Sequence, residues 1–388
     1  MNIIRYILAL LTVLSATACI DPFTPDIPPS DNRLVVIQGT IVSDSICPIW
    51  VSETDTDIFS DASDDDGKTR QTGASDPRLW VEGSDGSRYD GVRTNATAPD
   101  GRYTFMVSVG HLNPDETYCV RLDFHSESYQ SVPARPEPTP GIESINWSQE
   151  PSDSLVSISV TAEAPVNGEC YMEWKCVEDW EILANHPVYR YYDPAVGTIV
   201  PFDVDVSQGW KHAERLEPLI AASSRYPQNR VTDLLLYTIS GRDDRISVIY
   251  STHVIQRALS REEYEYIETE QKQTSGMGGI FTPMPGRLPT NIRCTTSSRK
   301  ALGFVGVSQN VVHRRLYIEG REVDYERDYP CDEDILLSKS MAECLTFWER
   351  GYQNYLWLGG GFGKWMPNVC LDVRARGASL VRPDFWAY

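Results

Sequence analysis

The stretch from residue 34 to residue 42 reads LVVIQGTIV, and it sets the fold class of the chain. Most of its residues are apolar or β-branched, which is the composition that strands favour. Similar runs follow at residues 46–52, 78–82, 101–109, 116–124 and 128–134. Turn-forming pieces such as Gly83-Ser84-Asp85-Gly86 separate them. Short strands with frequent turns predict a mainly β protein that begins with an immunoglobulin-like β-sandwich over residues 34–134.

A proline-rich segment ends this first unit. Pro133, Pro136, Pro138 and Pro140 stand within eight residues. Proline cannot donate to a β-ladder and favours an extended polyproline conformation, so this segment cannot enter a central strand. We therefore predict a linker at residues 135–141, followed by a larger β-rich C-terminal domain at residues 142–388.

The C-terminal domain is expected to open with a hairpin. Polar and apolar residues alternate over residues 155–163 and 169–177, and the Asn167-Gly168 pair between them is typical of a type I′ turn. Further strands are predicted at residues 231–240, 246–255, 301–307 and 313–319. Residues from about 178 to 230 show no clear periodicity, which predicts a long irregular insertion, and such loops often carry function.

Two short helices are predicted from their starting signals. Ser260-Arg261-Glu262-Glu263 and Ser340-Met341-Ala342-Glu343 both match a capping box, in which the serine satisfies a free backbone N–H of the first turn. The first helix is expected to end near residue 273 and the second near residue 351. In the second helix, Met341, Leu345 and Trp348 share one face.

The N-terminus reads MNIIRYILALLTVLSATAC. A single charged residue, a short apolar run and small residues at positions 15–18 predict a secretion signal over residues 1–18. The cysteine that follows resembles a lipobox, which predicts lipid attachment at Cys19; the alternative is a plain signal with an incidental cysteine. Residues 19–33 are rich in proline and aspartate and predict an extended tether. We expect a lipid-anchored protein of the outer membrane that faces the cell surface.

Charge and cysteine content narrow the function classes. The chain carries a formal net charge of −20, which repels nucleic-acid phosphates, so we expect no nucleic-acid partner. Of the nine cysteines, eight remain when Cys19 is set aside, and an even number in an exported protein favours disulfides. Eight cysteines allow 105 pairings, so the sequence does not assign them. Cys170 and Cys176 stand in one predicted strand, too far apart to bridge each other.

No motif for catalysis or metal binding stands out. The six histidines form neither a H-E-x-x-H pair nor a Cys/His zinc spacing, and no G-x-S-x-G elbow occurs. The acidic run at residues 61–67 does not keep the register of an EF-hand. The glycine-rich run at residues 359–364 is similar to a phosphate loop, but Trp365 occupies the position that needs Ser or Thr. We therefore expect no metal, no cofactor and no enzymatic activity.

Aromatic residues offer the better lead. The predicted insertion includes Trp180, Tyr189, Tyr191, Tyr192 and Trp210. Exposed Tyr and Trp give a large contact area at low entropic cost, so these rings are candidates for ligand binding. The alternative is that they pack the insertion onto its own domain. We expect four further tryptophans to lie in the core: Trp348, Trp357, Trp365 and Trp386.

Several stretches together resemble one family. They include the lipobox, the opening strand at residues 34–43, Ser260-Arg261-Glu262-Glu263-Tyr264 and the closing Arg382-Pro383-Asp384-Phe385-Trp386. In this order the chain resembles the domain-of-unknown-function 4249 family, which consists of Bacteroidota lipoproteins often encoded beside SusC-type TonB-dependent transporters. Members often end with a C-x-x-C-like pair, of which Cys370-Leu371-Asp372-Val373 keeps the first cysteine. Cysteine pairing therefore cannot be carried over from the resemblance.

The functional hypothesis joins these expectations. The resemblance implies a surface lipoprotein beside a SusC-type TonB-dependent transporter, and the aromatic insertion fits the capture or gating of a nutrient such as a peptide, a glycan or a chelate. A second hypothesis is a peptidase or glycosidase that feeds the transporter. A third is a structural or adhesion protein of the cell surface.

Overall fold

The computed structural model describes residues 34–54, 77–94, 102–150, 155–166, 168–215, 217–275, 289–324, 331 and 334–388. The predicted signal segment, Cys19, the tether, the acidic run at residues 61–67 and Asn167 lie outside the described residues. The mainly β fold class is confirmed, because strands dominate the order of elements. Among the described residues, no helix is long and apolar enough to cross a membrane.

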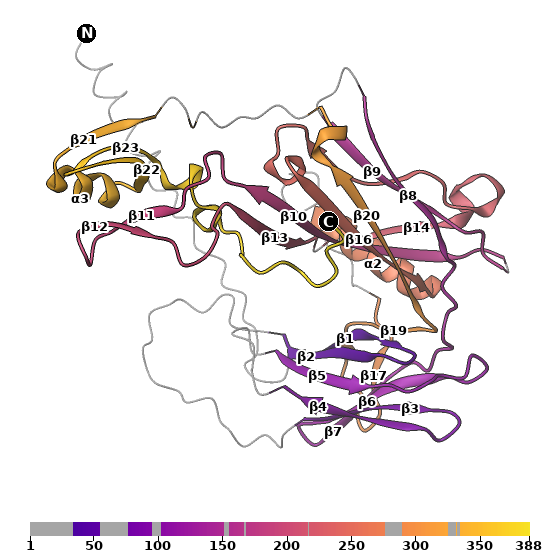
Figure 1. The fold of residues 1–388 in the computed structure, drawn as a ribbon. Coiled ribbons are helices and arrows are strands. Elements are labelled where there is room, and N and C mark those ends of the chain that lie inside the picture. Colours follow the sequence, from indigo (N-terminus) through magenta and orange to yellow (C-terminus); the bar gives the residue numbers. More distant parts are fainter. Residues whose placement is uncertain are drawn as a thin grey trace, which may run out of the picture.

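The N-terminal unit, which we call the barrel, is one sheet of ten strands (Figure 1). The pairing order is β17-β7-β6-β3-β4-β5-β2-β1-β18, and β19 also pairs with β1. An isolated bridge between Arg293 and Lys300 joins the two ends of this path, so the sheet is nearly closed. The strands are β1 (Val35–Val42), β2 (Ile46–Glu53), β3 (Arg78–Gly83), β4 (Arg88–Arg93), β5 (Tyr103–Ser108), β6 (Tyr118–Phe124), β7 (Glu127–Ser131), β17 (Ile292–Cys294), β18 (Ala301–Leu302) and β19 (Val305–Ser308).

Alternation along these strands builds the core of the barrel. Side chains of successive strand residues point to opposite faces, and the inward positions Ile37, Val81, Phe105 and Leu122 are buried together. The continuous path through nine strands, with β19 beside β1, describes one nearly closed sheet. The immunoglobulin-like topology predicted for residues 34–134 therefore stays a prediction.

The last three strands of the barrel correct the predicted domain assignment. Strand β1 pairs in parallel with β18 and β19, with Val35 opposite Ala301 and Thr40 opposite Gly306. Strand β17 pairs with β7. Residues 292–308 thus belong to the barrel and not to the predicted C-terminal domain. Local patterning marks a strand but does not name its partner, so a pairing across some 260 residues is invisible to it.

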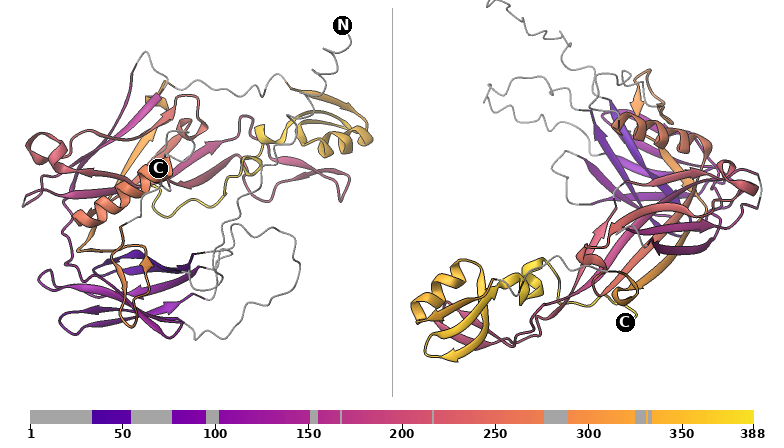
Figure 2. Two further views of the ribbon diagram at one scale, coloured as in Figure 1. Left: turned by 180° about the vertical axis from the view of Figure 1, so that it is seen from behind. Right: turned by 90° about the horizontal axis from the view of Figure 1, so that it is seen from above.

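The second unit, which we call the sandwich, packs two sheets face to face (Figures 1 and 2). One sheet has the order β13-β10-β16-β20 with β14 beside β10, and the other has the order β15-β9-β8. Ile158 and Ile239 of one sheet share a core with Trp174 and Val254 of the other. The strands are β8 (Ile142–Gln149), β9 (Leu155–Ala162), β10 (Tyr171–Leu183), β13 (Gln208–Glu214), β14 (Leu219–Ala222), β15 (Leu234–Ser240), β16 (Ile249–Leu259) and β20 (Val311–Glu319).

The predicted hairpin at residues 155–177 is wrong. Strand β9 pairs with β8 and β15, whereas β10 pairs with β13, β14 and β16. The two strands therefore lie in different sheets, and the turn at Gly168, with φ of 61°, connects the sheets. The reason is burial, because β9 and β10 both carry an apolar face. The two faces pack against each other across the core, and the strands are not hydrogen-bonded neighbours in one sheet.

The predicted irregular insertion is also wrong as a structural assignment. Residues 178–230 contain the end of β10, the strands β11 (Arg190–Asp193), β12 (Thr198–Pro201), β13 and β14, and the short 3₁₀ turns η2 (Ser223–Arg225) and η3 (Pro227–Asn229). Strands β11 and β12 pair with each other, so this part forms a hairpin. Four-residue strands are too short for periodicity to detect, although Tyr191, Tyr192 and Ile199 have high β-propensity.

Both predicted helices are confirmed as α2 (Arg261–Ser275) and α3 (Met341–Glu349). The Ser260 hydroxyl accepts a hydrogen bond from the backbone N–H of Glu263 at 3.1 Å. The Ser340 hydroxyl likewise accepts one from Glu343 at 3.3 Å. Further 3₁₀ turns are η4 (Asp244–Ile246), η5 (Gly320–Glu322), η6 (Asn368–Cys370) and η7 (Val373–Arg376).

A third part projects from the sandwich, and we call residues 190–201 and 334–367 the arm (Figure 2, right). It holds the hairpin β11–β12, helix α3 and a sheet of order β21-β23-β22, formed by β21 (Leu336–Lys339), β22 (Tyr352–Gly359) and β23 (Phe362–Pro367). Trp365 and Cys344 are its buried centre, and the backbone N–H of Tyr192 donates to Gln353 Oε1 at 2.7 Å.

Cysteines and tryptophans follow the expectations in part. A disulfide joins Cys331 to Cys370, with the Cα atoms 5.9 Å apart, at the base of the arm. The six other cysteines among the described residues are thiols: Cys47, Cys119, Cys170, Cys176, Cys294 and Cys344. Trp365 and Trp386 are buried as predicted, and Trp357 is half-buried. Trp348 is 40% exposed, so its predicted core position is wrong.

Candidate functional site

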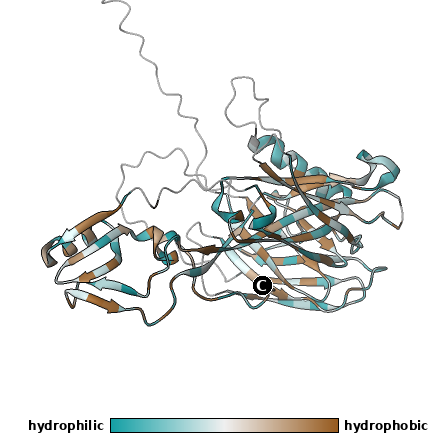
Figure 3. Cartoon of the chain, turned by 45° about the horizontal axis from the view of Figure 1, so that its top comes forward, coloured by the Kyte–Doolittle hydropathy of each residue, from teal (hydrophilic) through white to brown (hydrophobic). Residues whose placement is uncertain are grey.

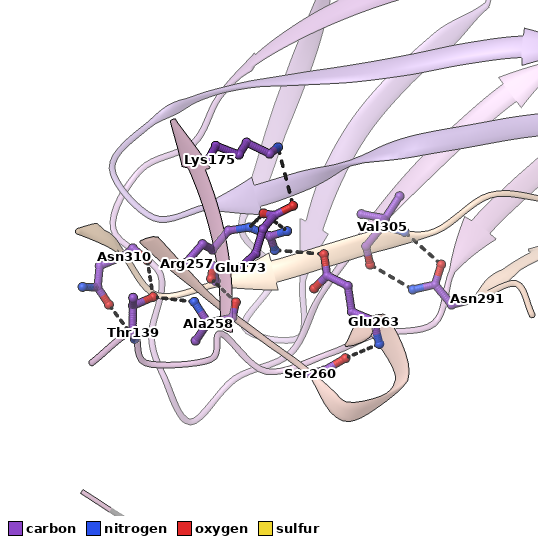
Figure 4. A network of polar contacts seen from close by, with 11 residues as sticks. Thr139, Glu173, Lys175, Arg257, Ala258, Ser260, Glu263, Asn291, Val305 and Asn310 are labelled. Carbon is purple, nitrogen blue, oxygen red and sulfur yellow. Dashed lines mark hydrogen bonds and ion pairs between the residues drawn. The ribbon is translucent and has the colours of Figure 1, made fainter. Parts of the chain in front are cut away.

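The barrel and the sandwich meet where the proline-rich linker passes the start of α2 (Figure 4). Glu137 forms a parallel bridge with Ser308 of β19, and its carbonyl accepts a hydrogen bond from Gln309 at 2.8 Å. The Thr139 hydroxyl donates to the Asn310 carbonyl at 2.6 Å and accepts from the Ala258 N–H at 3.0 Å. The predicted linker is therefore fastened to both units, which gives this junction a defined shape.

A buried ion network lies at the centre of the junction (Figure 4). Arg257, at the end of β16, donates through Nη2 to Glu173 Oε2 at 2.8 Å and through Nη1 to Glu263 Oε1 at 2.9 Å. Lys175 Nζ lies 3.7 Å from Glu173 Oε1. Arg257, Glu173 and Glu263 are all buried. Buried charges are tolerated only when they are paired, so the two carboxylates and the guanidinium depend on one another.

The barrel contributes close backbone contact to this network. A Cβ atom built at Gly306 of β19 would overlap the carboxylate of Glu263, so glycine permits the approach of the two units. Glu263 Oε2 is buried and has no hydrogen-bond partner among the described residues. Burial raises the pKa of the Glu263 carboxyl group, and the neighbouring Arg257 opposes that shift.

Two clefts flank this network. The first has a volume of about 590 Å³ and the second a volume of about 550 Å³, and both are lined by Glu137, Ser260 and Glu262. The first is further lined by Glu163, Glu169, Cys170, Tyr171 and Arg261, among others. The second is further lined by Arg135, Glu265, Asn291 and Phe304, among others. Clefts at domain interfaces are common ligand sites.

Carboxylates dominate the charge of these clefts. Their lining includes five glutamates against two arginines. Burial, and then the charge of Glu262, raise the pKa of Glu137. Burial, and then the charge of Glu137, raise the pKa of the Cys170 thiol to about 11, so this thiol is protonated at neutral pH and is a poor nucleophile. The clefts therefore favour a ligand that carries positive charge.

A second polar group covers the outer face of the sandwich. Asp179 Oδ1 lies 2.7 Å from His212 Nδ1, and Arg315 donates to Asp179 Oδ2 at 2.9 Å and to the Ser251 hydroxyl at 2.8 Å. In the strand register Asp179 stands between His212 and Ser251. Nucleophilic catalysis needs the histidine between the serine and the aspartate. This set therefore lacks the order of a catalytic triad.

Two histidines pair on the same face. His313 Nδ1 lies 3.2 Å from His253 Nε2. Burial, and then the charges of Arg315 and His313, lower the pKa of His253. Across the described part of the chain, no group of three or more His, Cys, Asp or Glu side chains is arranged to hold a metal ion.

The five predicted aromatic residues do not form one surface. Trp180 is buried in the core of the sandwich, and Tyr192 is buried in the arm, which is the packing alternative for these two rings. Trp210 is half-buried and its backbone pairs with Ser379. Tyr189 is 79% exposed. These five side chains therefore share no common surface on which they could bind one ligand.

Tyr191, one of the predicted aromatic residues, lines a hollow. Its ring stacks on Phe202 with centroids 4.6 Å apart, and both line a cleft of about 340 Å³ together with Asp372 and Arg374. Sequence reasoning missed the junction site altogether. A usable signal was Arg257, the one arginine of strand β16 and flanked by Ala258 and Leu259, because a buried arginine needs a buried partner.

Comparisons with known proteins place the chain in a family. No curated protein matches the sequence. Among solved structures, a DUF4785 family protein from Legionella pneumophila aligns at 9% identity with a TM-score of 0.22, covering 58% of this chain and 52% of that one. A Salmonella alpha-2-macroglobulin mutant aligns at 12% identity with a TM-score of 0.19, covering 75% of this chain and 15% of that one. The model of a domain of unknown function, DUF4249, matches residues 20–314, and the chain therefore belongs to that family.

Proposed function

We propose that this protein is a surface lipoprotein, anchored through Cys19, that serves a TonB-dependent outer-membrane nutrient transporter of the SusC type as a non-catalytic ligand-binding accessory. The observation that carries the proposal is the pair of adjoining clefts at the junction of barrel and sandwich, about 590 and 550 Å³ in volume. A preformed hollow of this size suits a small ligand.

The rigidity of the junction supports capture rather than catalysis. Thr139 joins the linker to Ala258 of β16 and to Asn310, which precedes β20, and the Glu173–Arg257–Glu263 network fixes the turn into α2. A site whose walls are already in place avoids the entropic cost of ordering them on binding. The excess of glutamates in the lining favours a peptide with amino or guanidinium groups over a neutral glycan.

Calorimetry with defined probes tests the ligand class. We expect the tripeptide Lys-Lys-Lys to bind the wild-type protein, while Glu-Glu-Glu and maltotriose do not. Replacing both Glu137 and Glu262 with Gln removes two carboxylates common to the two clefts and should weaken binding by about tenfold or more. The matched control is Glu349→Gln, an exposed residue of α3, which should bind as the wild type does.

Isolation from native membranes tests the partner. We expect a TonB-dependent transporter to co-purify with the protein, and the Cys19→Ala variant to be lost from the membrane fraction. Recovery of the lipidated protein without any such transporter would contradict the proposed partnership. The remaining hypotheses separate on deletion of the gene, because a hydrolase or an uptake accessory affects growth on a nutrient, whereas an adhesion protein affects attachment.

A further inference from the structure

The arm carries an unusual share of the exposed apolar surface. Among the described residues, 23 large hydrophobic side chains are exposed, and nine of them lie between residues 335 and 362. Figure 3 shows apolar segments along the strands and helix of the arm, at the left of the picture. Concentrated apolar exposure marks an interaction surface, whereas single exposed side chains do not.

Among the described residues, no layer covers one face of the sheet of the arm. In the register of β21, β23 and β22, Leu337 stands opposite Lys364, and Lys364 stands opposite Leu356. In the next outward row Phe362 stands opposite Lys339. Leu337 is 60% exposed, Phe362 53% and Leu356 44%. Apolar and cationic side chains thus alternate over this outer face.

The opposite face of the same sheet shows that the arm already has a core. Trp365, which follows Lys364 in β23, is fully buried, and its indole N–H donates to the Ser338 hydroxyl at 2.9 Å. Cys344 and Phe347 of α3 pack against this inner face. The outer face is therefore not needed to hold the arm together, which leaves it available to a partner.

Helix α3 adds a second exposed apolar row beside its packed side. Met341, Leu345 and Trp348 recur at the spacing of one helix face, and each is at least 37% exposed. Tyr355 of β22 is also 37% exposed. Trp and Tyr with one apolar part and one polar tip are favoured at the boundary between lipid and water.

Charge identifies the kind of partner. The arm as a whole is neutral in a chain of −20, since Arg190, Lys339, Arg350 and Lys364 balance Asp193, Asp334, Glu343 and Glu349, 4 − 4 = 0. Its outer sheet face is cationic, because the outward positions of β21, β22 and β23 include Lys339 and Lys364 and no acidic residue. A second copy docked on this face would bring lysines together without counter-ions, which is costly. An anionic lipid surface supplies both phosphates for the lysines and an apolar layer for the leucines.

We propose that the outer face of the arm is a membrane-contact surface that seats on an anionic phospholipid bilayer. Leu337, Leu356 and Phe362 enter the boundary between headgroups and acyl chains, and Lys339 and Lys364 pair with phosphates. This contact goes beyond the proposed function, because it requires neither a lipid on Cys19 nor a transporter.

Vesicle sedimentation tests the contact. The chain from residue 20 to residue 388 carries no lipid and keeps every described residue. We expect it to sediment with vesicles of equal parts phosphatidylglycerol and phosphatidylcholine, more weakly with pure phosphatidylcholine, and less as salt is raised. The Leu337→Ser/Phe362→Ser double variant should lower partitioning by about tenfold or more. Lys339→Gln/Lys364→Gln should remove most of the preference for anionic vesicles.

The matched control replaces two exposed apolar residues outside the arm, Val92→Ser and Leu235→Ser, which should partition as the wild type does. Unfolding in urea verifies that each variant is folded, as expected for outward-facing positions. Absence of vesicle binding by the folded wild-type chain would overturn the proposal. So would equal loss in the control, or a dimer in solution that the Leu337→Ser/Phe362→Ser variant abolishes. None of these outcomes bears on the tripeptide or co-purification experiments, so the two proposals fail independently.

Discussion

Arg257 and Glu263 are six residues apart in the chain, and Arg257 Nη1 lies 2.9 Å from Glu263 Oε1 across the turn that leads from β16 into α2. The same guanidinium holds Glu173 of the neighbouring strand β10. One side chain thereby links the sheet of the sandwich to the helix that carries the cleft residue Glu262. Gly306 of the barrel lies directly against this helix residue Glu263.

Removing the cation should therefore destabilise the protein strongly. Arg257→Met leaves Glu173 and Glu263 buried without a counter-charge, which costs about 3–5 kcal/mol of unfolding free energy. Urea unfolding measures the difference. Arg321→Met is the control, because its ion pair with Glu319 is exposed and should contribute less than about 1 kcal/mol. An equal loss of unfolding free energy in both variants would show that the buried network contributes no more than an exposed ion pair.

A side chain at Gly306 should force the barrel away from α2. Gly306→Ala places a Cβ atom against the Glu263 carboxylate, and overpacking of this kind costs about 1–3 kcal/mol. The expected result is a lower urea midpoint. At Gly110 the nearest atom to an added Cβ, on Tyr89, is 3.4 Å away, so Gly110→Ala should be tolerated. A Gly306→Ala protein as stable as Gly110→Ala would contradict the close approach.

The disulfide should hold the base of the arm. Cys331 and Cys370 are separated by 39 residues that include α3 and the arm sheet. Closing a loop of this length contributes about 3–4 kcal/mol by restricting the unfolded chain. We expect Cys370→Ser to make the arm sensitive to limited proteolysis while the barrel resists, and Cys294→Ser to have little effect.

A thiol count gives an independent check of the disulfide. The chain from residue 20 onward should titrate with six thiols when denatured and with 6 + 2 = 8 after reduction. Eight thiols before reduction would contradict the bond.

Mild acid should weaken the sandwich through His253. Burial, Arg315 and His313 lower the pKa of this histidine in the folded state, while Asp179 opposes them. As the pH falls, the histidine of the unfolded chain therefore takes up its proton before the histidine of the folded chain does. The free energy of unfolding that is present above the ordinary pKa of 6.5 is lost as the pH falls from that value through the lower pKa of the folded state. Urea midpoints measured across this window should fall less steeply for His253→Gln than for the wild type.

The elements that sequence predicted best are those whose cause is local. The capping serines Ser260 and Ser340 act within one helical turn, and the β-branched composition of residues 34–42 acts within one strand. The partners of β1 depend on packing across more than 260 residues, and the separation of β9 from β10 depends on which sheet each one covers. Neither is encoded in the residues of one window.

The junction site could not be predicted from the sequence, because it too depends on packing between distant residues. Glu263 fits a capping box by its position, yet its side chain turns to Arg257, because a buried cation outweighs a weak helix-capping contact. The stripe of Met341, Leu345 and Trp348 was visible in the sequence. Its exposure was not, because periodicity shows that a face exists and does not show what covers it.

The strands β17, β18 and β19 come late in the chain, and this affects how the first sheet is completed during synthesis. When the ribosome has completed β1 to β7, the first sheet still lacks both of its margins, and it stays open until residue 308 has been synthesised. An open β margin invites pairing with other chains, so a chain that has not reached residue 308 is expected to be prone to aggregation. A fragment that ends at the proline-rich segment would be expected to aggregate, even though it contains seven of the ten strands of its sheet.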